Sequence, residues 1–193
     1  MNAIDLLTDQ HNVVMGALDA MLDSKTIDDD ELLATADKLV AHMVIEEHIF
    51  YPRIRELKPE LVSESFEEHT VARFELGRAI LAEGAEKRSR VKVLKELLEH
   101  HIDEEQDAMF PKVKEGIGAK ELEALGVRMK AMFDKAVQKG FSRLVVEGYM
   151  LRGGAHGVRS EEAAPPEKTP KRPATRRGAG KRARSRTDDA RRH

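Results

Sequence analysis

Apolar residues recur every three or four positions along most of the first 150 residues, the spacing of one face of an α-helix. The pattern predicts four long helices, running from Ile4 to Asp23, from Asp28 to Pro52, from Pro59 or Ser65 to Gly84, and from Ala85 to Pro111. Short connections between helices of this length make neighbours antiparallel. We therefore predict an all-α fold, an up-down-up-down four-helix bundle, over residues 1–115.

Polar residues at fixed spacings indicate where these helices begin and end. Asp28 with Glu31, and Ser65 with Glu68, have the spacing of a capping box at a helix start. Pro52 has no backbone N–H to donate, so we expect it to kink or tighten the end of the second helix.

A second segment, residues 116–152, contains another amphipathic pattern. Its apolar stripe consists of Leu122, Leu125, Met129, Met132, Phe133 and Val137. We expect this extra helix to pack on the outside of the bundle, and a short helix to follow it over residues 141–151.

The last segment, residues 153–193, is rich in Pro, Ala, Lys and Arg and has no apolar period. Such a segment cannot bury enough apolar area to offset the entropy of ordering it. We therefore predict that it is a disordered basic tail.

The tail also separates charge along the chain. From Val158 to His193 there are 12 Lys and Arg against 5 Asp and Glu, a net charge of +7, so residues 1–157 carry −9 of the total −2. Basic tails of this kind bind nucleic acid through its phosphates, and without aromatic residues the binding is sequence-independent and salt-sensitive. The alternatives are a tail that only increases solubility or one that folds back on the acidic body.

Residue types that are missing exclude several classes of site and location. With no cysteine among 193 residues, disulfides, thiolate zinc sites, iron–sulfur clusters and a cysteine nucleophile are excluded. No apolar run approaches the roughly 20 residues of a membrane-spanning helix. The N-terminus has no basic start followed by an apolar stretch. We expect a cytoplasmic protein without a membrane partner, whose metals are held by His and carboxylate.

One polar pattern occurs twice inside apolar surroundings. The two stretches, each eleven residues long, are HMVIEEHIFYP from His42 and HIDEEQDAMFP from His101. Each begins with His, has Glu four residues later and ends with an aromatic residue before Pro. His11 and His69 lie on the apolar faces of the first and third helices. Counted from the helix turns at 1.5 Å per residue, all these groups fall at a similar height in the bundle.

These positions place six polar side chains in one inward-facing layer. The six residues are His11, His42, Glu46, His69, His101 and Glu105. Each His alone is more often a hydrogen-bonded core residue, and each Glu alone can pair at a solvated edge. Burying all six together is costly unless cations satisfy them. Imidazole and carboxylate suit iron, zinc or manganese, so the set predicts a dinuclear metal site.

The order of the ligands distinguishes this site from two other kinds of metal protein. Neither Glu-x-x-His, typical of ferritin-like bundles, nor the His-Glu-x-x-His of zinc proteases occurs in the chain. His-x-x-x-Glu, twice, with two further His resembles the hemerythrin-type, or HHE cation-binding, domain, over about residues 1–115. The resemblance implies a non-haem di-iron centre bridged by two carboxylates and an oxygen species. It makes the four His terminal ligands, and Glu46 and Glu105 the bridges.

Two positions depart from the oxygen-carrying members of that family. Arg73 stands where they have a fifth His, and Gln106 where they have a carboxylate, a role that Glu105 takes here. The four-His site leaves a coordination position open or water-filled, which disfavours simple reversible oxygen carriage. The resemblance then implies a protein that binds, senses or reacts with oxygen, nitric oxide or peroxide. The alternative is an iron- or zinc-handling protein without turnover, tethered to nucleic acid by its tail.

Polar residues beside the six have other predicted roles. Glu47 and Glu104 point about 100° away from the neighbouring ligand positions, so we expect a solvated edge or a supporting contact. His48 and His100 are off the inward stripe and are predicted at the surface. For Tyr51 we expect core packing in preference to an approach to the metal cavity.

Overall fold

The structure is a computed structural model, and it describes residues 1–140 and 142–151. All of these lie in one compact unit, Met1–Gly157, so the predicted tail is outside the described residues. Every described element is helical, as predicted. The elements are α1 (Ala3–Asp23), α2 (Asp29–Ile45), η1 (Glu46–Phe50), α3 (Tyr51–Ile54), α4 (Pro59–Leu81), α5 (Gly84–Glu104), η2 (Glu105–Met109), α6 (Phe110–Gly116), α7 (Ala119–Lys139) and α8 (Ser142–Leu151).

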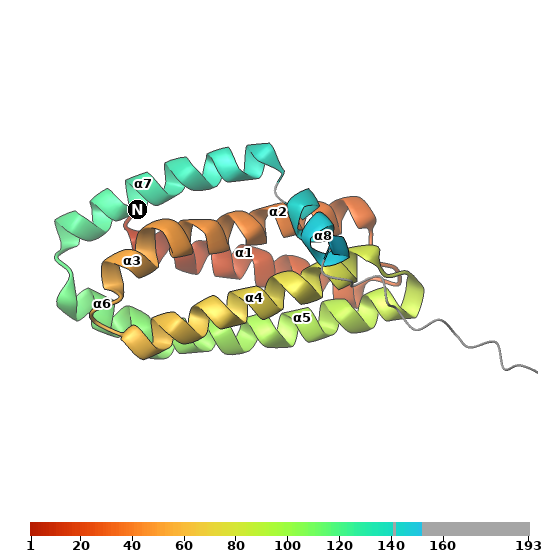
Figure 1. Cartoon of the computed structure of the whole chain (residues 1–193), viewed down its shortest axis with the longest axis horizontal. Coiled ribbons are helices and arrows are strands. Elements are labelled where there is room, and N and C mark those ends of the chain that lie inside the picture. The colour runs from red at the N-terminus through yellow and green to blue at the C-terminus, as the bar shows by residue number, and fades with distance from the viewer. Residues whose placement is uncertain (141, 152–193) are drawn as a thin grey trace, which may run out of the picture. The chain divides into compact units, whose positions relative to one another are not determined.

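Four of these helices form the predicted antiparallel bundle (Figure 1). The contacts close a ring, because α1 packs on α2, α2 on α4, α4 on α5, and α5 on α1. The chain continues from α2 through η1 into α3, and from α5 through η2 into α6. Two helix hairpins, α1–α2 and α4–α5, therefore make up the bundle, and each is extended beyond its second helix.

The apolar core is divided into two clusters. One contains Leu18, Leu39, Leu76 and Leu94 in the half of the bundle nearer the α1–α2 and α4–α5 turns. The other gathers residues from the opposite half, including Leu7, Ile45, Tyr51 and Phe110, and adds Met129 of α7. The polar residues singled out in the sequence occupy the layer between these two clusters.

The starts of the helices agree with the sequence signals in part. The Asp28 side chain accepts a hydrogen bond from the Glu31 N–H and caps α2. A helix start at Ser65 is wrong, because α4 begins at Pro59, and the Ser65 hydroxyl donates to the Leu61 carbonyl inside that helix. Proline at the first turn costs nothing, since its missing N–H would have no helical partner there.

The expected tightening at Pro52 is also wrong. The residues before it widen into a π-helical turn, Glu46–Phe50, and the helix continues to Ile54. The same widening, Glu105–Met109, precedes Pro111. A proline already interrupts the α-helical ladder because it has no N–H for the carbonyl four residues back. A single wider turn with an i→i+5 bond lets the helix pass this point, and such turns are frequent at functional sites.

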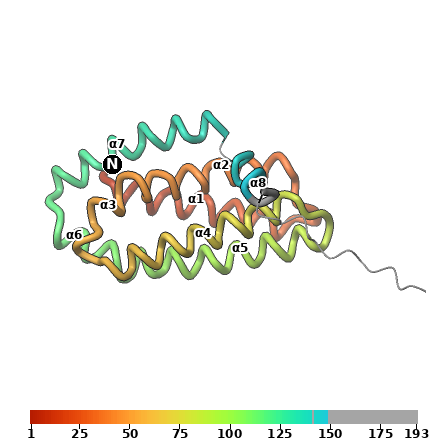
Figure 2. Tube along the Cα trace, viewed as in Figure 1, coloured from red at the N-terminus to blue at the C-terminus, as the bar shows by residue number. Residues whose placement is uncertain are grey.

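Helix α7 packs on the outside of the bundle against α1 and α2, as predicted, and the tube in Figure 2 follows it along that side. The close approach depends on Gly126, since a Cβ there would lie 2.7 Å from the backbone carbon of Asn2. Gly140, with a φ of 66°, ends the helix in the left-handed conformation that favours glycine. The short helix expected next is α8, which contacts α4 and α2.

Across the described part of the chain, no helix combines the length and apolar character needed to cross a membrane.

Candidate metal centre

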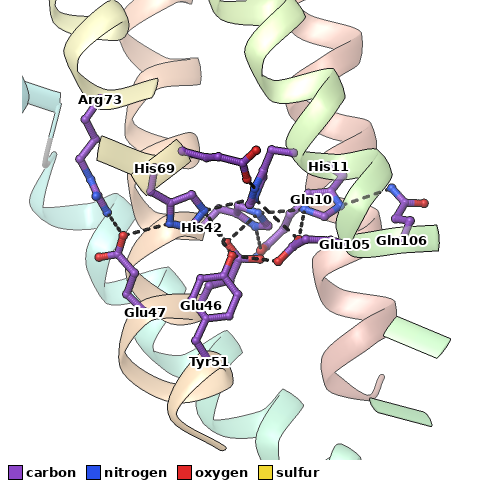
Figure 3. Close-up of polar contacts among 12 residues, drawn as sticks. Gln10, His11, His42, Glu46, Glu47, Tyr51, His69, Arg73, Glu105 and Gln106 are labelled. Atoms are coloured by element: carbon purple, nitrogen blue, oxygen red, sulfur yellow. Dashed lines mark hydrogen bonds and ion pairs between the residues drawn. The ribbon is translucent and has the colours of Figure 1, made fainter. Parts of the chain in front are cut away.

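The six polar residues of the sequence pattern meet in one buried layer of the bundle. Figure 3 labels His11, His42, Glu46, His69 and Glu105 of this layer. All are at most 3% exposed, and both glutamates are fully buried. The four His come one from each of the helices α1, α2, α4 and α5, and each Glu is the first residue of a π-helical turn. The six are His11, His42, Glu46, His69, His101 and Glu105.

The imidazoles form two pairs, one from each hairpin. In the α1–α2 histidine pair, His11 Nε2 lies 3.0 Å from His42 Nε2. In the α4–α5 histidine pair, His69 Nε2 lies 3.2 Å from His101 Nε2. Each pair therefore directs two ring nitrogens at one point, which is the arrangement in which two imidazoles share a cation.

The two carboxylates lie between the histidine pairs. Glu46 Oε2 is 3.2 Å from His42 Nε2 and 3.4 Å from His69 Nε2. Glu105 Oε2 is 3.3 Å from His11 Nε2 and 3.8 Å from His101 Nε2. Each carboxylate therefore reaches one imidazole of its own hairpin and one of the other hairpin, as a bridging ligand does.

These carboxylates lack the partners that burial requires. Among the described residues, none donates a hydrogen bond to either oxygen of Glu46 or to Glu105 Oε2. A buried carboxylate left in this state is strongly unfavourable. The donor atoms of His11, His42, Glu46 and Glu105 lie within 4.8 Å of one another, and so do those of Glu46, His69 and His101. The residues present thus fit two cations that share Glu46.

The outward nitrogens of the imidazoles are held by a second set of side chains. His42 Nδ1 donates to Gln10 Oε1 at 2.9 Å, and the Gln106 amide lies 3.4 Å from His11 Nδ1. The Gln10 contact places the His42 proton on Nδ1, which leaves Nε2 of that ring free to face the centre and fixes the ring orientation. The sequence did not predict this role for Gln10, although Gln10 directly precedes a predicted ligand.

In the α4–α5 histidine pair, carboxylates in place of amides contact the outward nitrogens. His69 Nδ1 donates to Glu47 at 2.9 Å, and His101 Nδ1 donates to Glu68 at 2.8 Å. The His101 contact holds the pKa of Glu68 below its ordinary value. The pKa of Glu47 is lowered too, because its contacts with His69 and Arg73 outweigh the effect of burial. Glu47 therefore has the supporting role expected of it, whereas Glu68 was missed.

Tyr51 is buried, as predicted, but its hydroxyl reaches the site. It donates to Glu105 Oε1 at 2.8 Å and lies 3.4 Å from His69 Nε2. The π-helical turn explains this position, because the Tyr51 N–H bonds the Glu46 carbonyl and so places residue 51 above residue 46. Phe110 has the equivalent place above Glu105 and stacks on His11 with ring centroids 6.1 Å apart.

The remaining polar neighbours lie farther out. His48 and His100 are exposed, as the helical period predicts. Glu104 is about a third exposed, and its carboxylate lies 3.6 Å from His100 Nε2, so it takes the solvated-edge role.

Burial and neighbouring charge shift the pKa values of Glu46 and Glu105 in opposite directions. Burial, together with the adjacent Glu105, raises the pKa of Glu46 well above its ordinary value. Burial also opposes ionisation of Glu105, but its contacts with His11, His101 and Tyr51 prevail and lower its pKa to about 2. In the cation-free protein Glu46 is therefore the carboxylate that keeps a proton more readily.

The pKa of each imidazole depends on its burial and on its charged neighbours. Burial lowers the pKa of His42 well below its ordinary value, with the other imidazoles adding to the effect. Burial also lowers the pKa of His69. For His101 burial acts in the same direction, but its contacts with Glu68 and Glu105 raise the pKa overall. A neutral imidazole is the form that binds a metal, so His42 and His69 are prepared for binding at neutral pH.

A small cavity of about 10 Å³ lies against the four imidazoles. This volume holds about one water-sized molecule. Apolar side chains complete its wall: Val14, Leu39, Met43, Leu98 and Ile102.

An antiparallel four-helix bundle with a buried layer of four His and two Glu defines a class of protein that binds cations between its helices. The sequence profile of the Hemerythrin HHE cation binding domain matches residues 2–113. The chain belongs to the hemerythrin HHE cation-binding domain family, and the resemblance seen in its motifs is confirmed.

A solved structure supports the fold of the chain. It is the crystal structure of a hemerythrin HHE cation binding domain-containing protein from Mycobacterium kansasii, 23% identical, with a TM-score of 0.62. The match covers 79% of this chain and 98% of that one. No curated protein sequence matches the chain significantly.

Proposed function

We propose that the buried layer holds two iron ions and that the protein binds, senses or reacts with oxygen, nitric oxide or peroxide. The observation that carries this proposal is the position of Glu46. It belongs to both of the fully buried groups of donor atoms, and neither of its oxygens accepts a hydrogen bond from the described residues. Two cations sharing this carboxylate would satisfy it.

The ligand roles follow from the geometry. The α1–α2 histidine pair would hold one ion and the α4–α5 pair the other, with Glu46 and Glu105 bridging between them. Imidazole with carboxylate is a donor set that suits iron. When bound, the iron ions supply one-electron redox chemistry and coordination positions for a small molecule.

Arg73 supports an open coordination position. It stands where oxygen-carrying hemerythrins have a fifth His, and its guanidinium donates to Glu47 at 2.6 Å. It is therefore engaged at the edge of the site and offers no ligand atom to it. The cavity beside the imidazoles restricts what can approach from that side to molecules about the size of water, which favours diatomic molecules and peroxide.

The Tyr51 hydroxyl lies beside the two carboxylates in Figure 3 and donates to Glu105 Oε1 at 2.8 Å. Burial and the nearby charge of Glu105 raise the pKa of its phenol well above the ordinary value, so the hydroxyl keeps its proton. It orients Glu105 by donating to Oε1, and its oxygen lies 3.4 Å from His69 Nε2. Tyr51 is therefore positioned to act as a neutral hydrogen-bond donor beside the centre.

Metal analysis and optical spectroscopy test the proposal on the full chain. We expect about two iron ions per chain after anaerobic loading with ferrous iron and exposure to air, because the site offers two groups of donor atoms. Near-ultraviolet absorption should respond to azide, nitric oxide or peroxide. Glu46→Ala and Glu105→Ala should each lose the dinuclear spectrum and at least one ion.

His48→Ala is the matched control, since His48 lies in the same stretch of sequence but is exposed. It should bind iron like the unmodified chain. A colourless protein that retains zinc after iron loading would overturn the iron proposal and favour metal handling. Retention of both ions by Glu46→Ala would show that the bridge is assigned to the wrong residue.

A further inference from the structure

The two histidine pairs correspond residue by residue, because the two hairpins repeat the same arrangement. His11 and His42 are 31 residues apart, and His69 and His101 are 32 apart. The residues that hold the outward ring nitrogens also stand at corresponding positions in the two hairpins. They differ in type, and the difference is one of charge.

The α1–α2 pair is supported by neutral amides. Gln10 Oε1 accepts from His42 Nδ1 at 2.9 Å, and the Gln106 amide lies 3.4 Å from His11 Nδ1. Gln10 directly precedes His11 in α1, and Gln106 directly follows Glu105. Neither amide adds net charge to this half of the site.

The α4–α5 pair is supported by carboxylates at the corresponding positions. Glu68, which directly precedes His69, accepts from His101 Nδ1 at 2.8 Å, and Glu47, which directly follows Glu46, accepts from His69 Nδ1 at 2.9 Å. Arg73 offsets part of the Glu47 charge through its own 2.6 Å contact. Glu68 has the exposed His100 as a cationic neighbour only when that ring is protonated, at 3.8 Å.

A charged acceptor on one ring nitrogen makes the other nitrogen a stronger donor to a metal. The carboxylates also attract a cation directly, whereas the amides do not. We propose that the two cation positions are chemically different and that the α4–α5 pair binds its cation first and more tightly. The inference rests on the proposed two-cation site and adds an order of filling, set by Glu47 and Glu68.

The surface above this pair is consistent with that order. A cavity of about 260 Å³ between α4 and α5 is lined by Glu64, Glu67 and His100 at the exposed side and reaches the buried rings of His69 and His101. An acidic opening raises the local concentration of cations beside the pair that it reaches. A cation entering here meets the carboxylate-supported pair first.

Anaerobic titration of the cation-free full chain with Co²⁺ tests the order. We expect two binding steps whose dissociation constants differ by more than the statistical ratio for equal sites. Glu68→Gln keeps an acceptor and removes the charge, so it should weaken the first step by about 10- to 100-fold. Glu47→Gln should have a smaller effect, because Arg73 already offsets part of its charge.

The matched control is Glu60→Gln, which removes the same charge from another exposed side chain of α4 that does not line this opening. It should leave both steps unchanged within twofold. Gln10→Glu should have the opposite effect to Glu68→Gln, tightening the second step and bringing the two constants together. Circular dichroism of each cation-free variant checks that the helices remain folded.

Nuclear magnetic resonance with one equivalent of Co²⁺ locates the first ion. Signals from residues beside His69 and His101 should shift or broaden before those beside His11 and His42. Two bound Co²⁺ ions with equal constants, or a first ion at the α1–α2 pair, would overturn the inference while leaving the two-cation site intact. Fewer than two ions at saturation would instead overturn the proposed function.

Discussion

At the scale of the residue, the site combines groups that destabilise the cation-free protein. Glu46 is fully buried, accepts no hydrogen bond from the described residues, and lies next to a second buried carboxylate. Evolution of a core for stability alone would place an apolar residue here, because an unpartnered buried carboxylate is unfavourable. The cost is accepted where a cation is to be bound, which is the common conflict between stability and function.

Replacing Glu46 with Gln should therefore stabilise the cation-free protein at neutral pH, by about 1–3 kcal/mol. Because burial raises the folded-state pKa of Glu46 above 4.5, its contribution to stability is fully present below that value and is lost as pH rises through the folded pKa. The gain from Gln should appear as pH rises above about 4.5 and be absent at lower pH. Urea unfolding of both proteins across this range, after removal of metal, measures it.

Glu67→Gln serves as the control for charge removal at an exposed site, and its unfolding free energy should stay within about 0.5 kcal/mol of the original. The contrary outcome is a loss of stability for Glu46→Gln at neutral pH. That result would mean that the carboxylate has a favourable partner in the cation-free protein.

At the scale of the element, the spacing of apolar residues predicted the helices. The six polar residues could be identified because they lie on the apolar faces of those helices. His42 and Glu46, four apart, share a face in any helix, so their convergence could be predicted without coordinates. The π-helical turns could not be predicted. An i→i+5 bond has no sequence signature beyond the prolines, and it places Tyr51 over Glu46, where regular α-helical spacing would put it on another face.

The supporting residues show the same limit. Glu68 and Gln10 lie on the sides of their helices, and only the crossing of neighbouring helices brings them to the imidazoles of α5 and α2. Each of them directly precedes a predicted ligand, His11 or His69, and this correspondence is visible in the sequence. It predicts a contact with an imidazole only when it is known which helices are neighbours.

The close packing of α7 on the N-terminal residues predicts that a larger residue at Gly126 destabilises the protein. A Cβ at Gly126 would lie 2.7–2.9 Å from backbone atoms of residues 1–3, which cannot move as freely as a side chain. Gly126→Ala should therefore destabilise the protein by about 1–3 kcal/mol. Gly16, exposed in the middle of α1 with nothing near its Cβ position, is the matched control.

Gly16→Ala should stabilise the protein by about 0.5–1 kcal/mol, because glycine is unfavourable inside a helix. Thermal and urea unfolding of the two variants, with equal metal content, compares them directly. Similar changes in both variants would show that α7 does not approach the N-terminal residues closely in solution.

At the scale of the whole molecule, the chain is divided into two segments of opposite net charge. All residues assigned to the centre and its support lie between Gln10 and Gln106, inside the stretch that matches the family. Residues 158–193 carry a net charge of +7 against −9 for the rest. Metal binding and any contact of the tail should therefore be separable.

We propose that this basic segment binds nucleic acid through phosphates, and removal of residues 158–193 tests it. The full chain should retard duplex DNA at low salt and release it as salt rises, because binding through phosphates displaces counterions. The shortened chain, with its charge of −9, should not retard DNA and should bind cations as before. Changing Asp188 and Asp189 to Asn is the control, since it alters the tail without removing positive charge and should not weaken retardation. Retardation by the shortened chain would place the contact on the bundle, and salt-independent retardation would contradict a phosphate contact.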